Sequence, residues 1–184
     1  SIVGSNSSLA SDYALDTSSK TVVATITPKT LTPAVSNAGV TKVYDGSTDA
    51  PSGFTPTYTW SGFINGDTDA SLTNNGANYN SKDVVNASRV TVNGLALSGG
   101  ITGTNSSALS DYALDATAKP VAATITAKPL TATATAANKV YDGTNTATPV
   151  LSINPAGLVG TETVTATGTA SYNSQNVSTA NLVT

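Results

Sequence analysis

The sequence has no cysteine, histidine or methionine among its 184 residues, and these absences exclude several kinds of chemistry. Without cysteine there is no disulfide framework. Without histidine and cysteine there is no Ser-His-Asp or Cys-His catalytic system and no ordinary zinc site. No Gly-x-x-x-x-Gly-Lys phosphate-binding motif occurs either. We therefore expect a protein that is not an enzyme and that needs no cofactor.

Charge is also scarce. Charged residues make up 10% of the chain, against roughly 25% in average globular domains. The eight Lys and Arg residues form no cluster and the net charge is −3, so we expect no nucleic-acid partner. The apolar runs are far shorter than the roughly 20 residues needed to cross a bilayer, so we expect no membrane insertion.

The residues that are abundant favour strands and turns. Thr and Val suit the pleated surface of a sheet, whereas Asn and Gly suit chain reversals. Low charge and absent cysteine fit a protein secreted by a Gram-negative bacterium. We expect an extracellular or cell-surface location, with any export signal lying outside these residues.

Laid on itself, the sequence repeats. The block Asn-Ser-Ser-x-x-Ser-Asp-Tyr-Ala-Leu-Asp occurs at residues 6–16 and 105–115, and Ala-Thr-Ile-Thr occurs at 24–27 and 123–126. Lys-Val-Tyr-Asp-Gly occurs at 42–46 and 139–143. The unit of about 95 residues is a normal size for one small β domain. We expect the C-terminal part of a repeat at 1–27, a complete repeat at 28–126 and the N-terminal part of a further repeat at 127–184.

Each Lys-Val-Tyr-Asp-Gly copy is expected to end a strand in a turn, because Asp-Gly favours tight turns. This motif supplies Tyr44, Asp45 and Gly46 in one copy and Tyr141, Asp142 and Gly143 in the other. We expect both tyrosines to anchor the core, with Lys42 and Lys139 on the opposite face. A ligand-binding or catalytic role for the two aspartates is the alternative.

Short alternating segments predict the strands. They lie at residues 31–35, 40–44, 57–60, 89–93, 95–97, 112–114 and 121–126, with a turn at 65–67 and an irregular or edge strand at 72–79. Residues 163–167 are expected to be the counterpart of 57–60. Several short strands separated by turns predict an all-β fold made of tandem small β-sandwiches, Ig-like or a related two-layer type.

The two Lys-Val-Tyr-Asp-Gly copies, the Tyr-Asn-Ser blocks at 79–81 and 172–174, the Ser-Asp-Tyr-Ala-Leu blocks and the closing Ala-Thr-Ile-Thr together resemble the YDG-type repeat of large exported bacterial proteins, the filamentous-haemagglutinin-like adhesins. The resemblance covers essentially the whole chain. It implies tandem β domains in the stalk of a surface adhesin and no catalytic residues.

Three kinds of binding or modification remain as alternatives. Asp67 and Asp69 could hold Ca²⁺ through their carboxylates, and Asp12, Asp16, Asp111 and Asp115 could do so too, although turn capping explains them. Glycosylation would use the Asn-x-Ser sites at Asn6, Asn86, Asn105 and Asn176. A Lys-Asp or Lys-Asn crosslink would involve Lys42 or Lys139 and needs a buried acid beside the lysine.

Three functions compete. The first is a non-catalytic spacer that projects a distal binding region from the cell, its partners being neighbouring repeats. The second is a module that binds a host or matrix glycan or protein, with Tyr58 and Trp60 as a stacking surface. Val164 and Ala166 are expected to replace them in the second copy, which favours core packing. The third is head-to-tail assembly, in which residues 1–27 of one molecule complete residues 127–184 of the next.

Overall fold

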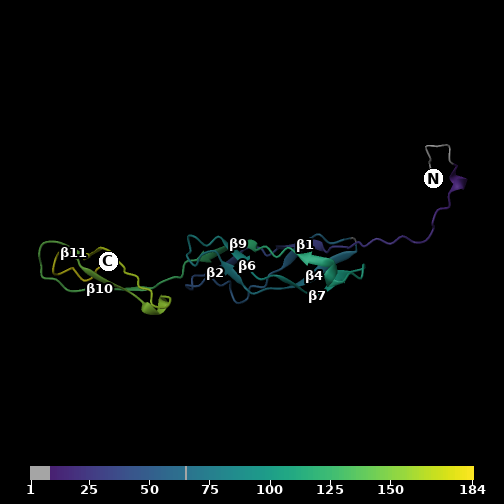
Figure 1. The fold of residues 1–184 in the computed structure, drawn as a ribbon. Helices are drawn as coiled ribbons and strands as arrows, with labels where there is room; N and C mark the ends of the chain where they lie inside the picture. The colour runs from purple at the N-terminus through teal and green to yellow at the C-terminus, as the bar shows by residue number, and fades with distance from the viewer. Residues whose placement is uncertain (1–8, 65) are drawn as a thin grey trace.

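The computed structural model describes residues 9–64 and 66–184. It is elongated, with three parts in a row along the chain (Figure 1). We call residues 9–27 the N-terminal segment, residues 28–126 the central segment and residues 127–184 the C-terminal segment. The two packed parts lie end to end along the long axis, and the N-terminal segment leads away from the far end of the central segment.

The described residues are almost entirely β, and the helices among them are three single 3₁₀ turns. The central segment contains β1 (Lys29–Val35), β2 (Val40–Val43), β3 (Tyr58–Ser61), β4 (Asp67–Thr73), β5 (Ala77–Tyr79), β6 (Arg89–Val92), β7 (Ala96–Gly103), η2 (Leu109–Asp111), β8 (Tyr112–Leu114) and β9 (Lys119–Thr126). The C-terminal segment contains β10 (Ala132–Ala136), β11 (Thr146–Ala147), β12 (Pro149–Ile153), η3 (Pro155–Gly157) and β13 (Ala170–Ser171), and η1 (Ala10–Asp12) lies in the N-terminal segment.

One end of the central segment is a four-stranded sheet in the order β2-β9-β6-β5. β9 lies inside this sheet, parallel to β2 and antiparallel to β6. Alternate residues of β9 face the interior, so Ala123 and Ile125 are buried with Val40, Tyr79 and Val90. The predicted strand at 121–126 is thus correct, and its position explains its β-branched, alternating sequence.

The other end of the central segment has a sheet in the order β3-β1-β8 and a β4-β7 pair. Leu31, Ala70 and Tyr112 form its buried core, against which Trp60 and Phe63 pack. The several sheets fit the predicted all-β, sandwich-like class. Within the described residues, no helix is both long and apolar enough to cross a membrane.

Three details differ from the predictions. β4 begins at Asp67, where a turn was expected, and β7 continues through Gly99 and Gly100 instead of ending there. Residues 163–167 form no strand. Instead, β12 pairs with β10 in the register that β3 keeps with β1. Leu151 and Ile153 therefore take the positions of Tyr58 and Trp60, and the expected replacement by Val164 and Ala166 is wrong.

The C-terminal segment is open. Within residues 127–184, all of which the structure describes, Ala147 alone is buried. Its pairings nevertheless match the central segment: the bridges between Thr146 and Ser171 and between Tyr172 and Val183 correspond to those that join Asp49 to Asn78 and Tyr79 to Val90. The C-terminal segment thus reproduces part of the pairing around β5.

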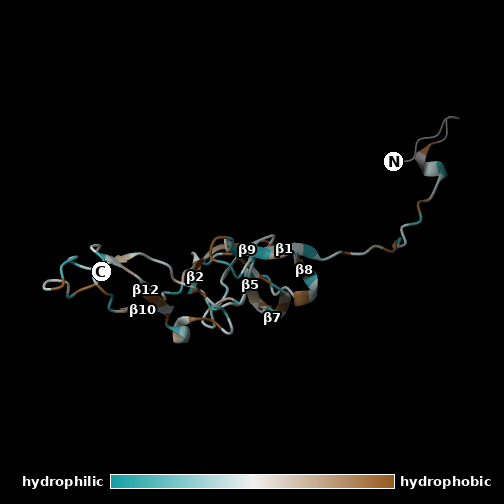
Figure 2. Ribbon diagram, turned by 90° about the vertical axis from the view of Figure 1, so that its left-hand side faces the viewer, coloured by the Kyte–Doolittle hydropathy of each residue, from teal (hydrophilic) through white to brown (hydrophobic). Residues whose placement is uncertain are grey.

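The N-terminal segment is extended after η1, and every side chain described in it is exposed. Its apolar residues lie outside both packed parts, as the brown stretches of the trailing chain show (Figure 2). Val22, Val23 and Ile26 are 87%, 96% and 101% exposed. Exposed branched apolar side chains in an extended segment are typical of a strand without its sheet.

Candidate functional site

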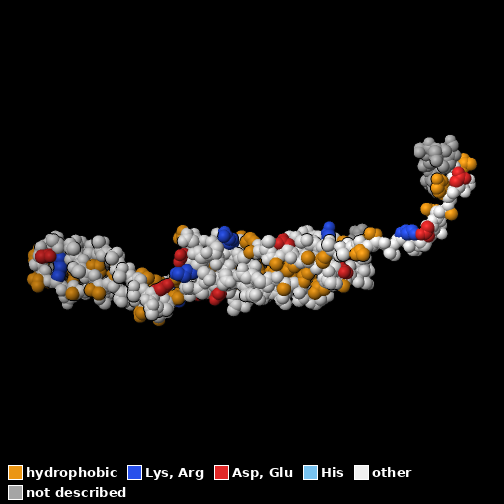
Figure 3. Space-filling model, viewed as in Figure 1, with side chains coloured by type: hydrophobic (Ala, Val, Ile, Leu, Met, Phe, Trp, Pro, Cys, Tyr) orange, Lys and Arg blue, Asp and Glu red, His pale blue; other side chains and the backbone are white. Residues whose placement is uncertain are grey.

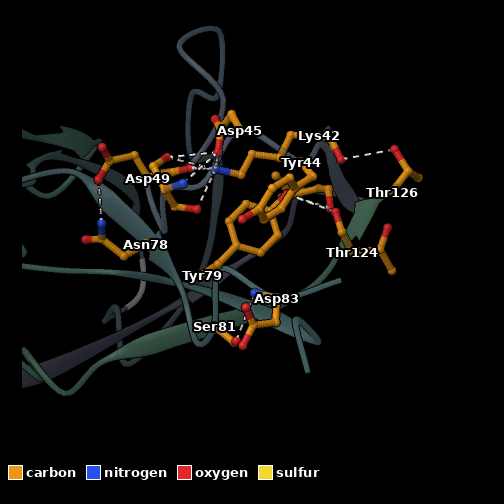
Figure 4. A network of polar contacts seen from close by, with 12 residues as sticks. Lys42, Tyr44, Asp45, Asp49, Asn78, Tyr79, Ser81, Asp83, Thr124 and Thr126 are labelled. Atoms are coloured by element: carbon orange, nitrogen blue, oxygen red, sulfur yellow. Dashed lines mark hydrogen bonds and ion pairs between the residues drawn. The ribbon is translucent and has the colours of Figure 1, made fainter. Parts of the chain in front are cut away.

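The Lys-Val-Tyr-Asp-Gly motif builds a closed loop around a buried ammonium group (Figure 4). Lys42 Nζ donates to Asp45 Oδ1 at 2.7 Å, to Ser47 O at 3.0 Å and to Asp49 O at 2.9 Å. The Lys42 side chain is 7% exposed, and its ammonium lies 5.3 Å from the centre of the Tyr79 ring. A buried charge is tolerated only when it is paired and hydrogen-bonded, and these contacts meet that condition.

Asp45 and Gly46 form the predicted turn. Asp45 Oδ1 accepts from the backbone N–H of Ser47 at 2.9 Å. The Lys42 ammonium, and after it this N–H, hold the pKa of Asp45 below its ordinary value. Gly46 has φ +79°, a conformation that favours glycine. The aspartate therefore acts as a turn cap, with its Oδ1 bound by both the lysine and the turn.

The second copy adopts the same local structure. Lys139 Nζ donates to Asp142 Oδ1 at 2.8 Å and to Thr144 Oγ1 at 2.8 Å. The ion pair lowers the pKa of Asp142 to about 2, with help from the backbone N–H of Thr144. Gly143 has φ +74°. Two copies 97 residues apart thus form one kind of loop, so the loop geometry is encoded locally.

The prediction that the lysine and the tyrosine of the motif lie on opposite faces of the strand is wrong. Lys42 points inward, because it lies two residues from Tyr44 on the same side of the strand. Tyr44 packs at the edge of the core, and its hydroxyl donates to Glu162 of the C-terminal segment. Tyr141 is 61% exposed and anchors no core. The Lys-Asp crosslink is also disfavoured, since the side chains of Asp45 and Asp142 are about half exposed.

The two candidate calcium ligands, Asp67 and Asp69, have different surroundings and different hydrogen-bond partners. Asp67 is buried, and its Oδ2 accepts from Tyr112 Oη at 2.6 Å and from Ser107 Oγ at 2.7 Å. Asp69 is exposed and accepts from the backbone N–H of Ala70. Among the described residues, no group of three or more acidic side chains is placed to hold a metal. Asp67 instead joins β4 to β8.

The other repeated aspartates cap turns, as predicted. Asp12 Oδ2 and Asp111 Oδ2 each accept from a backbone N–H three residues earlier at 2.8 Å. Asp115 Oδ2 pairs with Lys119 Nζ at 2.9 Å. The glycosylation candidates Asn86, Asn105 and Asn176 are exposed, whereas Asn6 lies outside the described residues.

Tyr58 and Trp60 take part in a row of aromatic rings. The ring centre of Trp60 lies 6.5 Å from that of Tyr58 and 5.6 Å from that of Phe63, which in turn meets Tyr112 edge to face. Trp60 is half-buried against the core of Leu31, Ala70 and Tyr112. The Tyr58 hydroxyl is buried, and none of the described residues gives it a hydrogen bond. This packing accounts for Trp60 without a ligand.

A contact that the sequence did not reveal joins the two packed parts. Val159 lies against Gly46, where an added Cβ would come within 2.9 Å of Val159 Cγ1. A cavity of about 290 Å³ lies beside it, lined by Tyr44, Val84, Leu130, Val159 and Glu162. The hydrogen bond to Glu162 is the main cause that raises the pKa of Tyr44. We call this contact the joint.

Comparison with known proteins gives one family. The model of the YDG domain matches residues 27–119 and again residues 126–184, which together are most of the chain. No curated protein and no solved structure matches it.

Proposed function

Because the chain belongs to the YDG domain family, we propose that it is a non-catalytic spacer made of tandem β-sandwich repeats. Such a spacer would form part of the stalk of an adhesin on the surface of a Gram-negative bacterium. Its direct partners would be neighbouring repeats of the same protein, and a distal region would bind the host or matrix.

The joint is the observation that carries this proposal. A spacer must keep its length, so successive units should contact one another and not be connected by a free linker. Here the Asp-Gly turn of the central segment receives Val159, and Tyr44 donates to Glu162 across the same contact. The Asp-Gly motif thus serves the connection between units, and the units lie in a row (Figure 1).

The surface supports the same function. Its few charges are scattered along the visible face and form no concentrated patch (Figure 3). The lysines and aspartates of both motif copies are used in their own loops. A surface with few, scattered charges suits a soluble spacer and presents no concentrated charge for a ligand.

The test measures the stiffness of the joint. Because the chain has no cysteine, spin labels can be attached through Arg89→Cys and Ser152→Cys, one in each packed part. A narrow distance distribution is expected, and Val159→Asp should broaden it because a charge would enter the apolar contact. Val150→Asp, an exposed change in β12, is the control. A broad distribution in the unmodified joint would refute a stiff spacer.

Ligand binding separates this proposal from a binding module. The spacer should bind no glycan and no matrix protein on an array. Binding that disappears in Trp60→Ala with unchanged thermal stability would favour the module instead.

A further inference from the structure

We propose that Asn93 is a site of spontaneous covalent modification, at which the side-chain amide is converted to an acid after attack by the backbone nitrogen of Gly94. Asn93 reacts ahead of Asn75, which lies beside it, because the glycine N–H that follows Asn75 is held in a hydrogen bond. The inference goes beyond the spacer function, since it concerns a chemical change of the chain and holds or fails independently of the stalk.

The sequence supplies the candidates. Asn-Gly occurs three times, at residues 65–66, 75–76 and 93–94. Glycine has no side chain that would hinder its backbone nitrogen, and its backbone adopts many conformations. The nitrogen and the amide carbon that it attacks belong to adjacent residues, so their proximity favours the reaction. Asn65 lies outside the described residues, and the comparison therefore concerns Asn75 and Asn93.

The two sites lie side by side in the central segment. Two short connections, residues 74–76 and 93–95, join the β4-β7 pair to the β5-β6 pair. We call these two connections the crossing. Asn75 N–H donates to Asn93 O at 2.8 Å, and Asn93 N–H donates to Gly76 O at 3.0 Å. The crossing thus connects the sheets at the two ends of the central segment.

Both Asn-Gly pairs are exposed to solvent, and both need their glycine. Gly76 has φ +100° and Gly94 has φ +61°, conformations that favour glycine. The Asn75 side chain also lies over Gly94, where an added Cβ would come within 2.4 Å of Asn75 Nδ2. A larger residue that would slow the attack is therefore disfavoured at both positions.

The hydrogen bonds of the two glycine N–H groups distinguish the sites. Gly76 N–H donates to Asn74 Oδ1 at 3.0 Å. Gly94 N–H makes no hydrogen bond to any described residue. The attacking nitrogen must lose its proton, and a hydrogen bond that stabilises the N–H opposes this loss. Gly94 is therefore the better placed of the two nucleophiles.

The reaction needs water as its only co-reactant. Gly94 N gives up its proton and bonds to Asn93 Cγ, the Cγ–Nδ2 bond breaks, and Nδ2 takes up a proton and leaves as ammonia. Water then opens the cyclic imide at one of its two carbonyl carbons. One opening gives aspartate. The other leaves Gly94 attached through Cγ, which is an isoaspartate with one more methylene in its main chain.

Conversion should loosen the crossing. Asn93 Nδ2 donates to Asn78 Oδ1 at 3.2 Å, and Asn78 Nδ2 donates to Asp49 Oδ1 at 2.9 Å (Figure 4). A carboxylate at position 93 only accepts hydrogen bonds, so it cannot replace the bond to Asn78 Oδ1. Isoaspartate also lengthens the main chain between β6 and β7, which are both held by partner strands.

The first experiment measures conversion at Asn93 and Asn75 in the same molecules. The full chain is incubated in heavy-oxygen water at neutral and at mildly alkaline pH, and tandem mass spectrometry of its peptides locates each new acid. Asn93 should convert about fivefold faster than Asn75, the factor expected for one hydrogen bond, and both rates should rise with pH. Equal rates, or faster conversion at Asn75, would overturn the proposal.

The same measurement in urea tests whether the fold selects Asn93. Unfolding removes the hydrogen bond of Gly76 N–H, so the two sites should then convert at similar rates. An unchanged preference for Asn93 in urea would show that its neighbours in sequence cause the preference, which would contradict the proposal.

The second experiment removes the acceptor of the Gly76 N–H. Asn74→Ala should speed conversion at Asn75 by about fivefold, and an unchanged rate at Asn93 in the same sample would show that the crossing is still folded. Thr73→Ala is the matched control, because the Thr73 hydroxyl donates to Ala96 O and not to the Asn-Gly pair. If Asn74→Ala and Thr73→Ala leave the same rate at Asn75, the assigned cause is wrong.

The third experiment measures the consequence for stability. The isoaspartate form is separated from the incubated sample and compared with Asn93→Asp, which adds the same charge to a main chain of normal length. The isoaspartate form should have the lower thermal midpoint, because its longer main chain no longer fits between β6 and β7. Equal midpoints would refute a role for the crossing in holding the two sheets.

Discussion

Residues 9–27 and 108–126 have closely related sequences, yet only the second set is packed. Both begin with a 3₁₀ turn capped by an aspartate, η1 and η2. Both continue with an aspartate that accepts from the N–H two residues on, at 2.9 Å for Asp16 and 3.1 Å for Asp115. They differ in their strands: residues 112–114 form β8 and residues 119–126 form β9, whereas the corresponding residues 13–15 and 20–27 form no strand.

The comparison shows which structures residues close in sequence can form by themselves. It also shows which structures need residues that are distant in the sequence. A capped turn uses hydrogen bonds within a few residues and forms in either setting. A strand needs partners for its backbone groups and a cover for its apolar face. β9 receives both from β2 and β6, whereas residues 20–27 receive neither from the residues that the structure describes.

The largest expected difference concerns the buried isoleucine. Ile125→Ala should lower the free energy of unfolding by about 3 kcal/mol, because it removes a core side chain and leaves a cavity. Ile26→Ala should change it by less than about 0.5 kcal/mol, since the side chain is fully exposed. Urea denaturation at a concentration at which the chain is monomeric measures both. Similar losses would mean that residues 20–27 pack within the same molecule.

A smaller difference in stability is expected between substitutions of Tyr112 and Tyr13, which occupy corresponding positions in the two blocks. Tyr112→Phe removes a donor to the buried carboxylate of Asp67 and should cost about 1–3 kcal/mol. Burial and the bond to Asp67 both raise the pKa of Tyr112. Tyr13→Phe, at a side chain 55% exposed, should leave the thermal midpoint unchanged and serves as the matched control. An unchanged midpoint for Tyr112→Phe would show that Asp67 is satisfied in another way.

The smallest expected difference concerns how the thermal midpoint depends on pH. Pairing with lysine lowers the pKa of both Asp16 and Asp115 to about 2 from 3.8. A lowered carboxyl pKa contributes stability above the unfolded-state value, and this contribution is lost as the pH falls from about 4 to about 2. Asp115→Asn should therefore flatten the fall of the thermal midpoint in that range.

Asp16→Asn should leave that fall unchanged, because the turn around Asp16 is attached to no packed structure. NMR titration of the two carboxyls in the unmodified chain should give similar low pKa values. An equal effect of both substitutions on the midpoint would contradict the comparison.

Much of the fold was predictable because short sequence patterns specify its strands and turns. Alternation located β1, β2, β3, β6, β8 and β9, and Asp-Gly located both motif turns. The start of β4 was missed because Asn-Gly-Asp at residues 65–67 looks like a turn. The end of β7 was missed because Gly99 and Gly100 look like a strand end, whereas the pairing of β4 with β7 carries the strand through them. The inward position of Lys42 was missed because a lysine is expected outside. Only the assembled loop shows the carbonyl and carboxylate oxygens that bind it.

The order of the repeated blocks, the turn at each Asp-Gly and the caps at the aspartates were determined by the sequence alone, since each depends on residues a few positions apart. The tertiary structure decided which copy of a block is buried, how the joint forms and that Tyr44 contacts Glu162. These depend on strands brought together from distant positions, because the partners that bury an apolar face and complete a sheet are not encoded beside it.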